Sequence, residues 1–170
     1  MTDRATACDR GAVTVSLAPF PPSDLAGWMT AQRASYVDDR LRAGDDEAAA
    51  ERNAQASHDR LFPDGRLAPG HEVLRILEDG VPVGVIWVGP HPQELDGVAW
   101  IWDVEVDEPS RGRGFGRAAM LLAEEHALAL GYRALALNVF GFNTTARGLY
   151  ESLGYETTAV QMRKELRVSE

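Results

Sequence analysis

Glycine and arginine alternate in the stretch PSRGRGFGRAAM, which runs from Pro109 to Met120 and leads into a helix-like apolar sequence. Each glycine weakens a helix by roughly 0.5–1 kcal/mol relative to alanine, so glycines at a helix start need a reason. A glycine-rich turn that opens a helix presents free backbone N–H groups and the positive end of the helix dipole to one point. Arginine side chains can bind phosphate oxygens there in a bidentate manner. The stretch therefore predicts a site for a phosphate-bearing ligand, formed by Arg111, Gly112, Arg113, Gly114, Phe115, Gly116 and Arg117.

Three other ligand-binding patterns do not fit this loop. A P-loop requires Lys and then Ser or Thr after its last glycine, whereas Arg117 and Ala118 follow Gly116. A dinucleotide-binding turn has the spacing G-x-G-x-x-G after an early strand, whereas this chain has G-x-G-x-G late in its sequence. RGG-type RNA-binding segments occur in repeated disordered tracts, and this copy is single and lies in an acidic chain. These three functions are therefore disfavoured.

The loop and a second motif together resemble the GNAT acetyltransferase superfamily. The pattern Arg111-x-x-Gly114-x-Gly116, five residues beyond Val106, is similar to the pyrophosphate-binding motif of that superfamily. The stretch LNVFGFNTTARGLYESLGYE resembles its other signature, which is a strand, an Asn-led helix, a Tyr and a Leu-Gly-Tyr exit. The resemblance covers the chain from about residue 100 to about residue 162. It implies an enzyme that uses acetyl coenzyme A as acyl donor and needs no metal.

The same resemblance implies a cofactor site that depends mainly on main-chain groups. The main chain of the strand before the loop would pair with the pantetheine arm as an added strand does. The glycine loop would hold the pyrophosphate, and the Asn-led helix would lie beside the pantetheine. The implied cofactor-binding residues are Val104, Glu105, Val106, all seven loop residues from 111 to 117, Asn138, Asn143, Ala146 and Tyr150.

Tyr150 matches the tyrosine that commonly protonates the departing thiolate in this superfamily. Asn143, Ala146 and Tyr150 stand at i, i+3 and i+7, which places them on one face of the expected helix. A phenol with a pKa of about 10 can stabilise a thiolate by a hydrogen bond and, with favourable geometry, donate its proton. The competing interpretation is a core tyrosine that packs against Leu149 and Leu153.

Acetyl transfer also requires that the attacking amine lose a proton, and two carboxylates are candidates to accept it. For an amine with a pKa of about 10.4, deprotonation at neutral pH costs on the order of 4–5 kcal/mol. Asp103 and Glu105 interrupt an otherwise apolar strand, where charge is costly unless it is paired or functional. Strand alternation places both opposite Trp100 and Trp102, unless a bulge intervenes. Either is a candidate base or amine anchor, and an ion pair with an arginine or a base acting through water is the alternative.

Aromatic residues are the main candidates for an acceptor pocket. Tryptophans on the strands could offer apolar and cation–π surface to an amine, although ordinary sheet packing is the alternative. The four histidines show no spacing typical of metal ligands, and His71 at the start of a predicted hairpin could face the acceptor. The predicted substrate-pocket residues are Tyr36, His71, Trp87, Trp100, Trp102 and Asp103.

The periodicity of the chain predicts the elements that position these residues. Apolar residues recur at helical spacing after PFPPSD, where Ser23 or Asp24 can cap a helix that Gly44 ends. From His71 the period changes to two around an Asp79-Gly80 turn, which is a strong hairpin signal. The expected strands are 12–18, both arms of the hairpin within 71–88, 98–106, 134–139 and a closing segment 155–166, and the expected helices are 25–44, 45–61, 115–130 and 143–153.

These elements predict one α/β (α+β) domain over residues 1–170, with residues 1–10 as a flexible leader. The resemblance implies a mixed, mostly antiparallel sheet of about six or seven strands, flanked by about four helices.

Composition limits the partners. The formal net charge of −9 argues against a nucleic-acid partner, whose phosphates require clustered Lys and Arg. No apolar run approaches the ~18 residues of a membrane span, and the first residues lack a secretory signal, which predicts a cytoplasmic protein without a membrane partner. Cys8 is the only cysteine, which excludes an internal disulfide.

The sequence therefore predicts an N-acetyltransferase that moves an acetyl group directly from acetyl coenzyme A to a primary amine, without an acyl-enzyme. The acceptor would be a small molecule or a peptide, and a homodimer is the candidate assembly. The alternative is a non-catalytic module that binds acyl coenzyme A, with the loop intact and no productive base. An adenine-nucleotide binder is a second alternative.

Overall fold

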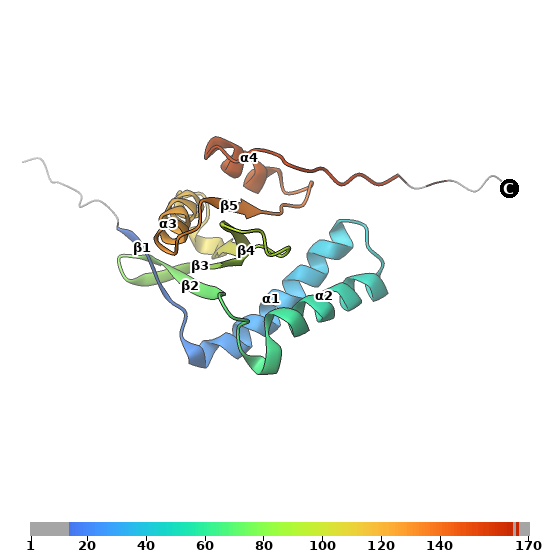
Figure 1. Cartoon of the computed structure of the whole chain (residues 1–170), viewed down its shortest axis with the longest axis horizontal. Helices are drawn as coiled ribbons and strands as arrows, with labels where there is room; N and C mark the ends of the chain where they lie inside the picture. Colours follow the sequence, from blue (N-terminus) through green and yellow to red (C-terminus); the bar gives the residue numbers. More distant parts are fainter. Residues whose placement is uncertain (1–13, 165, 167–170) are drawn as a thin grey trace, which may run out of the picture.

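A single sheet with helices on both faces forms the body of the molecule. The computed structural model describes residues 14–164 and 166 (Figure 1). In this part of the chain the strands are ordered β1-β2-β3-β4-β5, with β4 and β5 parallel and all other neighbours antiparallel. The strands are β1 (Val15–Pro19), β2 (Glu72–Glu78), β3 (Val81–Pro90), β4 (Val98–Val106) and β5 (Ala134–Leu137). The helices are α1 (Pro22–Arg42), α2 (Glu47–Leu61), α3 (Phe115–Ala129) and α4 (Thr144–Ser152), with short 3-10 turns at Pro63–Gly65 and Glu108–Ser110.

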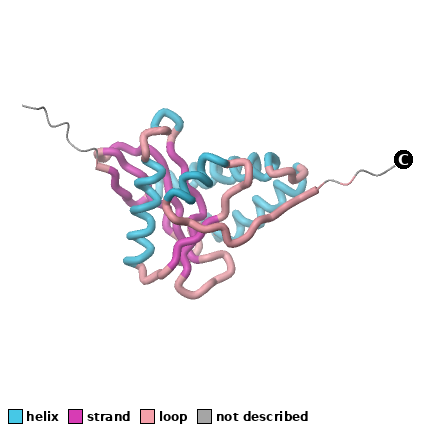
Figure 2. The backbone as a smooth tube through the Cα atoms, turned by 90° about the horizontal axis from the view of Figure 1, so that it is seen from above, coloured by secondary structure: helices cyan, strands magenta, loops and turns pink. Residues whose placement is uncertain are grey.

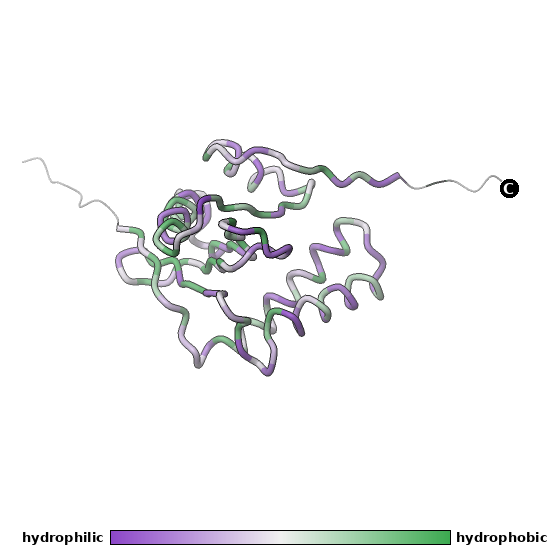
Figure 3. The backbone as a smooth tube through the Cα atoms, viewed as in Figure 1, coloured by the Kyte–Doolittle hydropathy of each residue, from purple (hydrophilic) through white to green (hydrophobic). Residues whose placement is uncertain are grey.

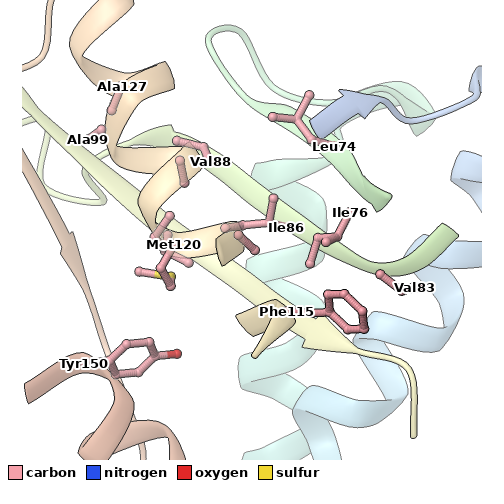
Figure 4. Packing of buried hydrophobic residues seen from close by; sticks show 13 residues of the cluster. Leu74, Ile76, Val83, Ile86, Val88, Ala99, Phe115, Met120, Ala127 and Tyr150 are labelled. Atoms are coloured by element: carbon pink, nitrogen blue, oxygen red, sulfur yellow. The ribbon is translucent and has the colours of Figure 1, made fainter. Parts of the chain in front are cut away.

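The two faces of the sheet bury two separate apolar clusters, because successive strand residues point to opposite sides. On β2, Val73 packs with Met29 of α1, whereas Leu74 packs with Met120 of α3. The α3 cluster, drawn in Figure 4, also includes Tyr150 of α4. Figure 2 shows the strands crossing the centre of the molecule with helices on either side. The predicted mixed, mostly antiparallel sheet with four flanking helices is confirmed.

The local signals for the central elements are also confirmed. The β2–β3 hairpin turns at Asp79 and Gly80, whose φ values of 47° and 85° are those of the favoured two-residue hairpin turn. Strand 98–106 has the predicted bounds, and the predicted helix 115–130 ends one residue earlier, at Ala129. These elements combine strong periodicity with glycine at the turns, so local sequence determines them.

The closing β segment predicted for residues 155–166 is wrong, which leaves five described strands rather than six or seven. Tyr155 packs against the α3 cluster, but the chain beyond it forms no ladder in its described part. Its alternating apolar residues Val160 and Met162 are 73% and 89% exposed. Alternation specifies a strand only where a neighbouring strand and a buried face exist, and this segment has neither.

Two predictions near the N-terminus also need comment. Helix α1 begins at Pro22 with Pro21 as its N-cap, so the predicted cap at Ser23 or Asp24 is wrong. Proline suits the first helical position because its missing N–H has no helical partner there. The leader 1–10 and Cys8 lie outside the described residues.

No helix in the described ranges combines the length and the apolar character needed to cross a membrane.

Candidate active site

A cavity opens where strands β4 and β5 separate. The parallel ladder joins only Val98–Ile101 to Ala134–Leu137, and β4 then continues alone to Val106. The edge of β4 beyond Ile101 therefore has no strand partner on this side within the described chain. A cavity of about 490 Å³ lies along that edge and is lined by Val104 and Glu105 of β4 and by Asn138 and Val139, which follow β5. Unpaired main-chain groups of this kind can pair with an extended ligand as an added strand would.

A β-bulge in β4 turns both tryptophan and carboxylate side chains toward this cavity. Asp103 is opposite Trp87 on β3, and Ile101 is opposite the next residue, so Trp102 is an extra residue in the ladder. After the bulge, Val104 packs in the α3 cluster, whereas Trp102 packs on the α1–α2 side. Asp103 faces α1, because its carboxylate interacts with Gln32. The bulge cancels the expected separation of the carboxylates from Trp100 and Trp102, since all of these residues line the cavity.

The glycine loop ends at the N-terminus of α3, next to the cavity. Gly112 and Gly114 have φ values of 76° and 88°, which other residues adopt only with strain. Gly114 is the N-cap and no side chain caps the helix, so the first amides, including those of Phe115 and Gly116, have no helical partner. A Cβ on Gly116 would lie 3.4 Å from Leu149 of α4, so glycine also permits close packing there. The turn can therefore accept an anion on its amides.

The three arginines of the loop differ in their availability. Arg113 bonds to Glu78, and its guanidinium lies 4.7 Å from the Phe115 ring centroid. Arg117 bonds to the Ser152 hydroxyl. Arg111 donates from Nε to the carbonyl of Val106 at 2.9 Å and is the loop arginine that lines the cavity.

Two of the titratable groups that line the cavity have shifted pKa values that bear on catalysis, Tyr150 of α4 and Asp103 of β4. Burial, with a smaller effect from the charge of Asp103, raises the pKa of Tyr150, which is 9% exposed. Figure 4 shows its hydroxyl pointing away from α4. Burial, followed by the charge of Glu105, raises the pKa of Asp103 to about 6. At neutral pH the tyrosine therefore carries a proton and Asp103 is mainly a carboxylate, which suits an acid and a base.

Glu105 and Asn143 have more local partners. A carboxylate oxygen of Glu105 lies 3.8 Å from a guanidinium nitrogen of Arg111, and both side chains are exposed. The Asn143 side chain accepts a hydrogen bond from the Ala146 amide at 3.1 Å, so Asn143 caps α4 as well as lining the cavity. Ala146 itself packs against the α3 cluster.

The part of the cavity predicted to bind the acceptor, called the acceptor end, has an aromatic wall, defined here as Trp87, Trp100 and Trp102. The ring centroids of Trp87 and Trp102 lie 5.7 Å apart, and those of Trp100 and Trp102 lie 6.5 Å apart. Trp102 donates from its indole nitrogen to the Pro90 carbonyl at 3.1 Å, which fixes its ring. Tyr36 of α1 also lines the cavity.

His71 lies outside the cavity lining and supports the wall. It accepts a hydrogen bond from the Trp87 indole at 3.1 Å, and its ring lies 5.3 Å from that of Trp102. Burial and the charge of Arg60 lower its pKa to about 4, so it is neutral at physiological pH. A Cβ on Gly89 would lie 2.4 Å from the His71 ring, so the strand needs glycine at this point.

Of the cavity residues on the first two helices, sequence reasoning named only Tyr36 and missed the others. These helices carry many hydrophilic residues, as Figure 3 shows. Their polar residues nevertheless line the cavity, because α1 and α2 pack side by side across the open end of β4. No local signal distinguishes such residues from ordinary surface positions. The missed cavity residues from this pair include Gln32, Arg33, Asp39, His58 and Arg60.

The strand pair β4–β5 opens beside a glycine turn whose first amides have no helical partner, and an Asn-capped helix with a buried tyrosine follows. A sequence model of the Acetyltransferase (GNAT) family matches residues 28–155, and the chain belongs to this family. It is an acetyltransferase.

Named relatives agree with this assignment. The chain is 32% identical over 158 residues to YycN, an uncharacterised N-acetyltransferase of Bacillus subtilis, covering 91% of this chain and all of YycN. The crystal structure of YycN superposes with a TM-score of 0.82. Mycothiol acetyltransferase of Paenarthrobacter aurescens is 28% identical over 144 residues, which is 42% of that protein. The aminoglycoside N-acetyltransferase AAC(6')-Iy in complex with coenzyme A shares the fold at 17% identity, with a TM-score of 0.57, over 95% of this chain.

Proposed function

We propose that the cavity binds acetyl coenzyme A and an amine together, and that the enzyme transfers the acetyl group directly between them. One observation carries this proposal. The unpaired edge of β4 leads directly into the glycine turn, while Asp103 and Tyr150 face the same cavity. The chain would act as a single domain, since β4 and β5, which precede the two cofactor motifs, and the strands that carry the aromatic wall belong to one sheet.

The donor would be held mainly by the main chain. Pantetheine amides would pair with the edge formed by Val104, Glu105 and Val106, which has no strand partner there. The pyrophosphate would lie on the amides of residues 112–117, at the positive end of α3. Arg111 would add charge at the cavity side, with Asn138, Asn143 and Ala146 beside the pantetheine arm.

The cavity then supplies an acid and a base for the reaction. Asp103 takes one proton from the ammonium, directly or through water, and the neutral amine attacks the thioester carbonyl. The C–N bond forms and the C–S bond breaks, and Tyr150 gives its proton to the sulfur. The second nitrogen proton is lost as the tetrahedral intermediate collapses, and transfer through solvent restores the tyrosine. The products are the amide, coenzyme A and one proton.

Asp103 fits the base role better than Glu105. Its pKa of about 6 combines a dominant carboxylate form at pH 7 with a stronger basicity than an ordinary aspartate has. Glu105 is exposed and lies beside Arg111, an arrangement typical of a surface ion pair.

The direct test is turnover. The purified protein is incubated with acetyl coenzyme A and a panel of primary amines, and released thiol is measured. We expect acetylation of at least one amine, and Tyr150→Phe should lower kcat by about 100-fold while changing acetyl-coenzyme-A affinity less than about twofold. Tyr132→Phe removes a hydroxyl from a tyrosine outside the cavity and serves as the matched control.

Two outcomes would contradict the proposal. Tight binding of acetyl coenzyme A without turnover on any amine would indicate a non-catalytic module. Stabilisation by ATP equal to that by acetyl coenzyme A would indicate an adenine-nucleotide binder.

A further inference from the structure

One cation at the acceptor end of the cavity is not matched by a carboxylate. Three arginines line the cavity in its described part, and two of them have acidic partners. Arg33 pairs with Glu51 at 2.6 Å, and Arg111 lies 3.8 Å from Glu105. Arg60 of α2 has no ion pair with any residue that the structure describes.

Arg60 contacts the aromatic wall. Its guanidinium carbon lies 5.4 Å from the ring centroid of Trp102, a cation–π contact. Trp102 is itself fixed by its hydrogen bond to Pro90 and by its neighbours Trp87 and Trp100. A guanidinium that lies over a ring keeps the N–H donors of its edge free for an anion. Arg60 is an exposed residue whose guanidinium lies over the Trp102 ring at the rim of the cavity.

The opposite charge lies next to it along the cavity. Asp103 follows Trp102 in the chain, and the bulge turns both toward the α1–α2 side. Asp39 of α1 lines the same cavity and raises the pKa of Asp103, so two carboxylates lie near one another there. Asp103 and Arg60 therefore carry opposite charges at the same cavity, and both are neighbours of Trp102.

This distribution of charge fits one class of acceptor. An amine alone would be attracted to Asp103 and repelled by Arg60, whereas a molecule with both an amine and a carboxylate would match both groups. Resting on the proposed function, we propose that the acceptor is a zwitterionic amino acid whose carboxylate binds Arg60 while its amine faces Asp103. Arg60 is then a specificity-determining residue, and the wall favours acceptors with an apolar or aromatic side chain.

The test uses acceptors that differ only in the carboxylate. The full chain is assayed with acetyl coenzyme A and four pairs, each an amino acid and its decarboxylated amine. The pairs are L-phenylalanine with 2-phenylethylamine, L-lysine with cadaverine, glycine with methylamine, and γ-aminobutyrate with propylamine. We expect kcat/KM for at least one amino acid to exceed that of its partner by about 10-fold or more, because a bidentate charged contact is lost with the carboxylate.

Substitution of Arg60 then isolates the contact. Arg60→Gln should lower kcat/KM for that amino acid about 10-fold or more, through KM, and leave its decarboxylated partner within about twofold. Arg60→Lys keeps the charge without the planar fork and should give an intermediate value. Arg52→Gln is the matched control, because Arg52 is an exposed α2 residue outside the cavity. Thermal unfolding and acetyl-coenzyme-A binding of each variant report whether the fold and donor site are intact.

Every other result overturns the inference in a distinguishable way. Equal or better acetylation of the decarboxylated amines would refute the zwitterionic acceptor and leave acetyl transfer standing. An equal loss on both members of a pair in Arg60→Gln would show a structural role for Arg60. Acetyl-coenzyme-A binding without acetylation of any amine would overturn the proposed function together with the inference.

Discussion

The proposed donor and acceptor ends of the cavity are built in different ways. The donor end uses the edge of β4, the amides of residues 112–117 and the cap of α4, all within one continuous stretch of the chain. The acceptor end uses side chains of α1, α2 and β4, brought together from distant positions. Main-chain geometry can serve the same cofactor in many sequences, whereas side-chain charge distinguishes one acceptor from another. Sequence motifs therefore predict the cofactor, whereas they do not predict the acceptor.

The largest expected effect lies where the two ends meet, at Asp103. Asp103→Asn removes the base without changing side-chain size, so kcat/KM at pH 7 should fall about 100-fold or more. In the unsubstituted enzyme kcat/KM should rise with pH through about 6, as the carboxylate forms. The variant should lose this acidic limb while its acetyl-coenzyme-A affinity stays within about twofold. A variant with the original pH profile would show that another group, such as water or Glu105, is the base.

A substitution confined to the donor end sharpens the contrast. Gly114→Val places a branched residue at a φ of 88°, where the strain is conformational because no atom lies within 4 Å of the new Cβ. We expect acetyl-coenzyme-A affinity, measured by calorimetry, to fall about 10-fold or more.

Gly27→Ala on α1 is the control for that experiment, because its Cβ also meets nothing and its φ is not in the left-handed region. It should leave acetyl-coenzyme-A affinity unchanged. Equal affinity in Gly114→Val would mean that the turn does not hold the pyrophosphate.

A substitution at the acceptor end should weaken acceptor binding and leave acetyl-coenzyme-A binding nearly unchanged. Trp102→Leu removes the ring beneath Arg60 and the hydrogen bond to Pro90, so the acceptor KM should rise about fivefold to tenfold. The KM for acetyl coenzyme A should change less than about twofold. A rise in the KM of both substrates would show that the Trp102 ring maintains the β4 bulge as well as the aromatic wall.

The smallest expected effect is one of stability. The pKa of Asp103 is higher in the folded protein, about 6, than the value of 3.8 for an unperturbed aspartate. The charged carboxylate therefore destabilises the fold, with no penalty below pH about 3.8 and the full penalty above pH about 6. Asp103→Asn should raise Tm by about 3 °C at pH 8 and change it little at pH 3.5, as measured by calorimetry. An unchanged or lower Tm at pH 8 would show that the carboxylate is not under this burial penalty.

Sequence reasoning reached the donor end because local rules determine it. The loop from Arg111 to Arg117, the strand before it and the Asn143-led helix each follow from glycine positions, periodicity and capping. The roles assigned to these residues remain predictions, as does a homodimer.

The acceptor end depends on interactions between distant segments. The bulge at Trp102 depends on register with β3, and His71 leaves the cavity because Gly89 admits its ring beside Trp87. Arg60 is an exposed residue, and only the packing of α2 places it at the cavity. The prediction of a closing β segment was wrong for the same reason, since alternation alone cannot supply a neighbouring strand.

A crystal structure of the chain with coenzyme A tests the central claim most directly. The account predicts pantetheine paired with the main chain of Val104 and Val106, pyrophosphate on the amides of residues 112–117, and sulfur within hydrogen-bond distance of the Tyr150 hydroxyl. Coenzyme A bound elsewhere, or a turn filled by side chains of the protein itself, would contradict it.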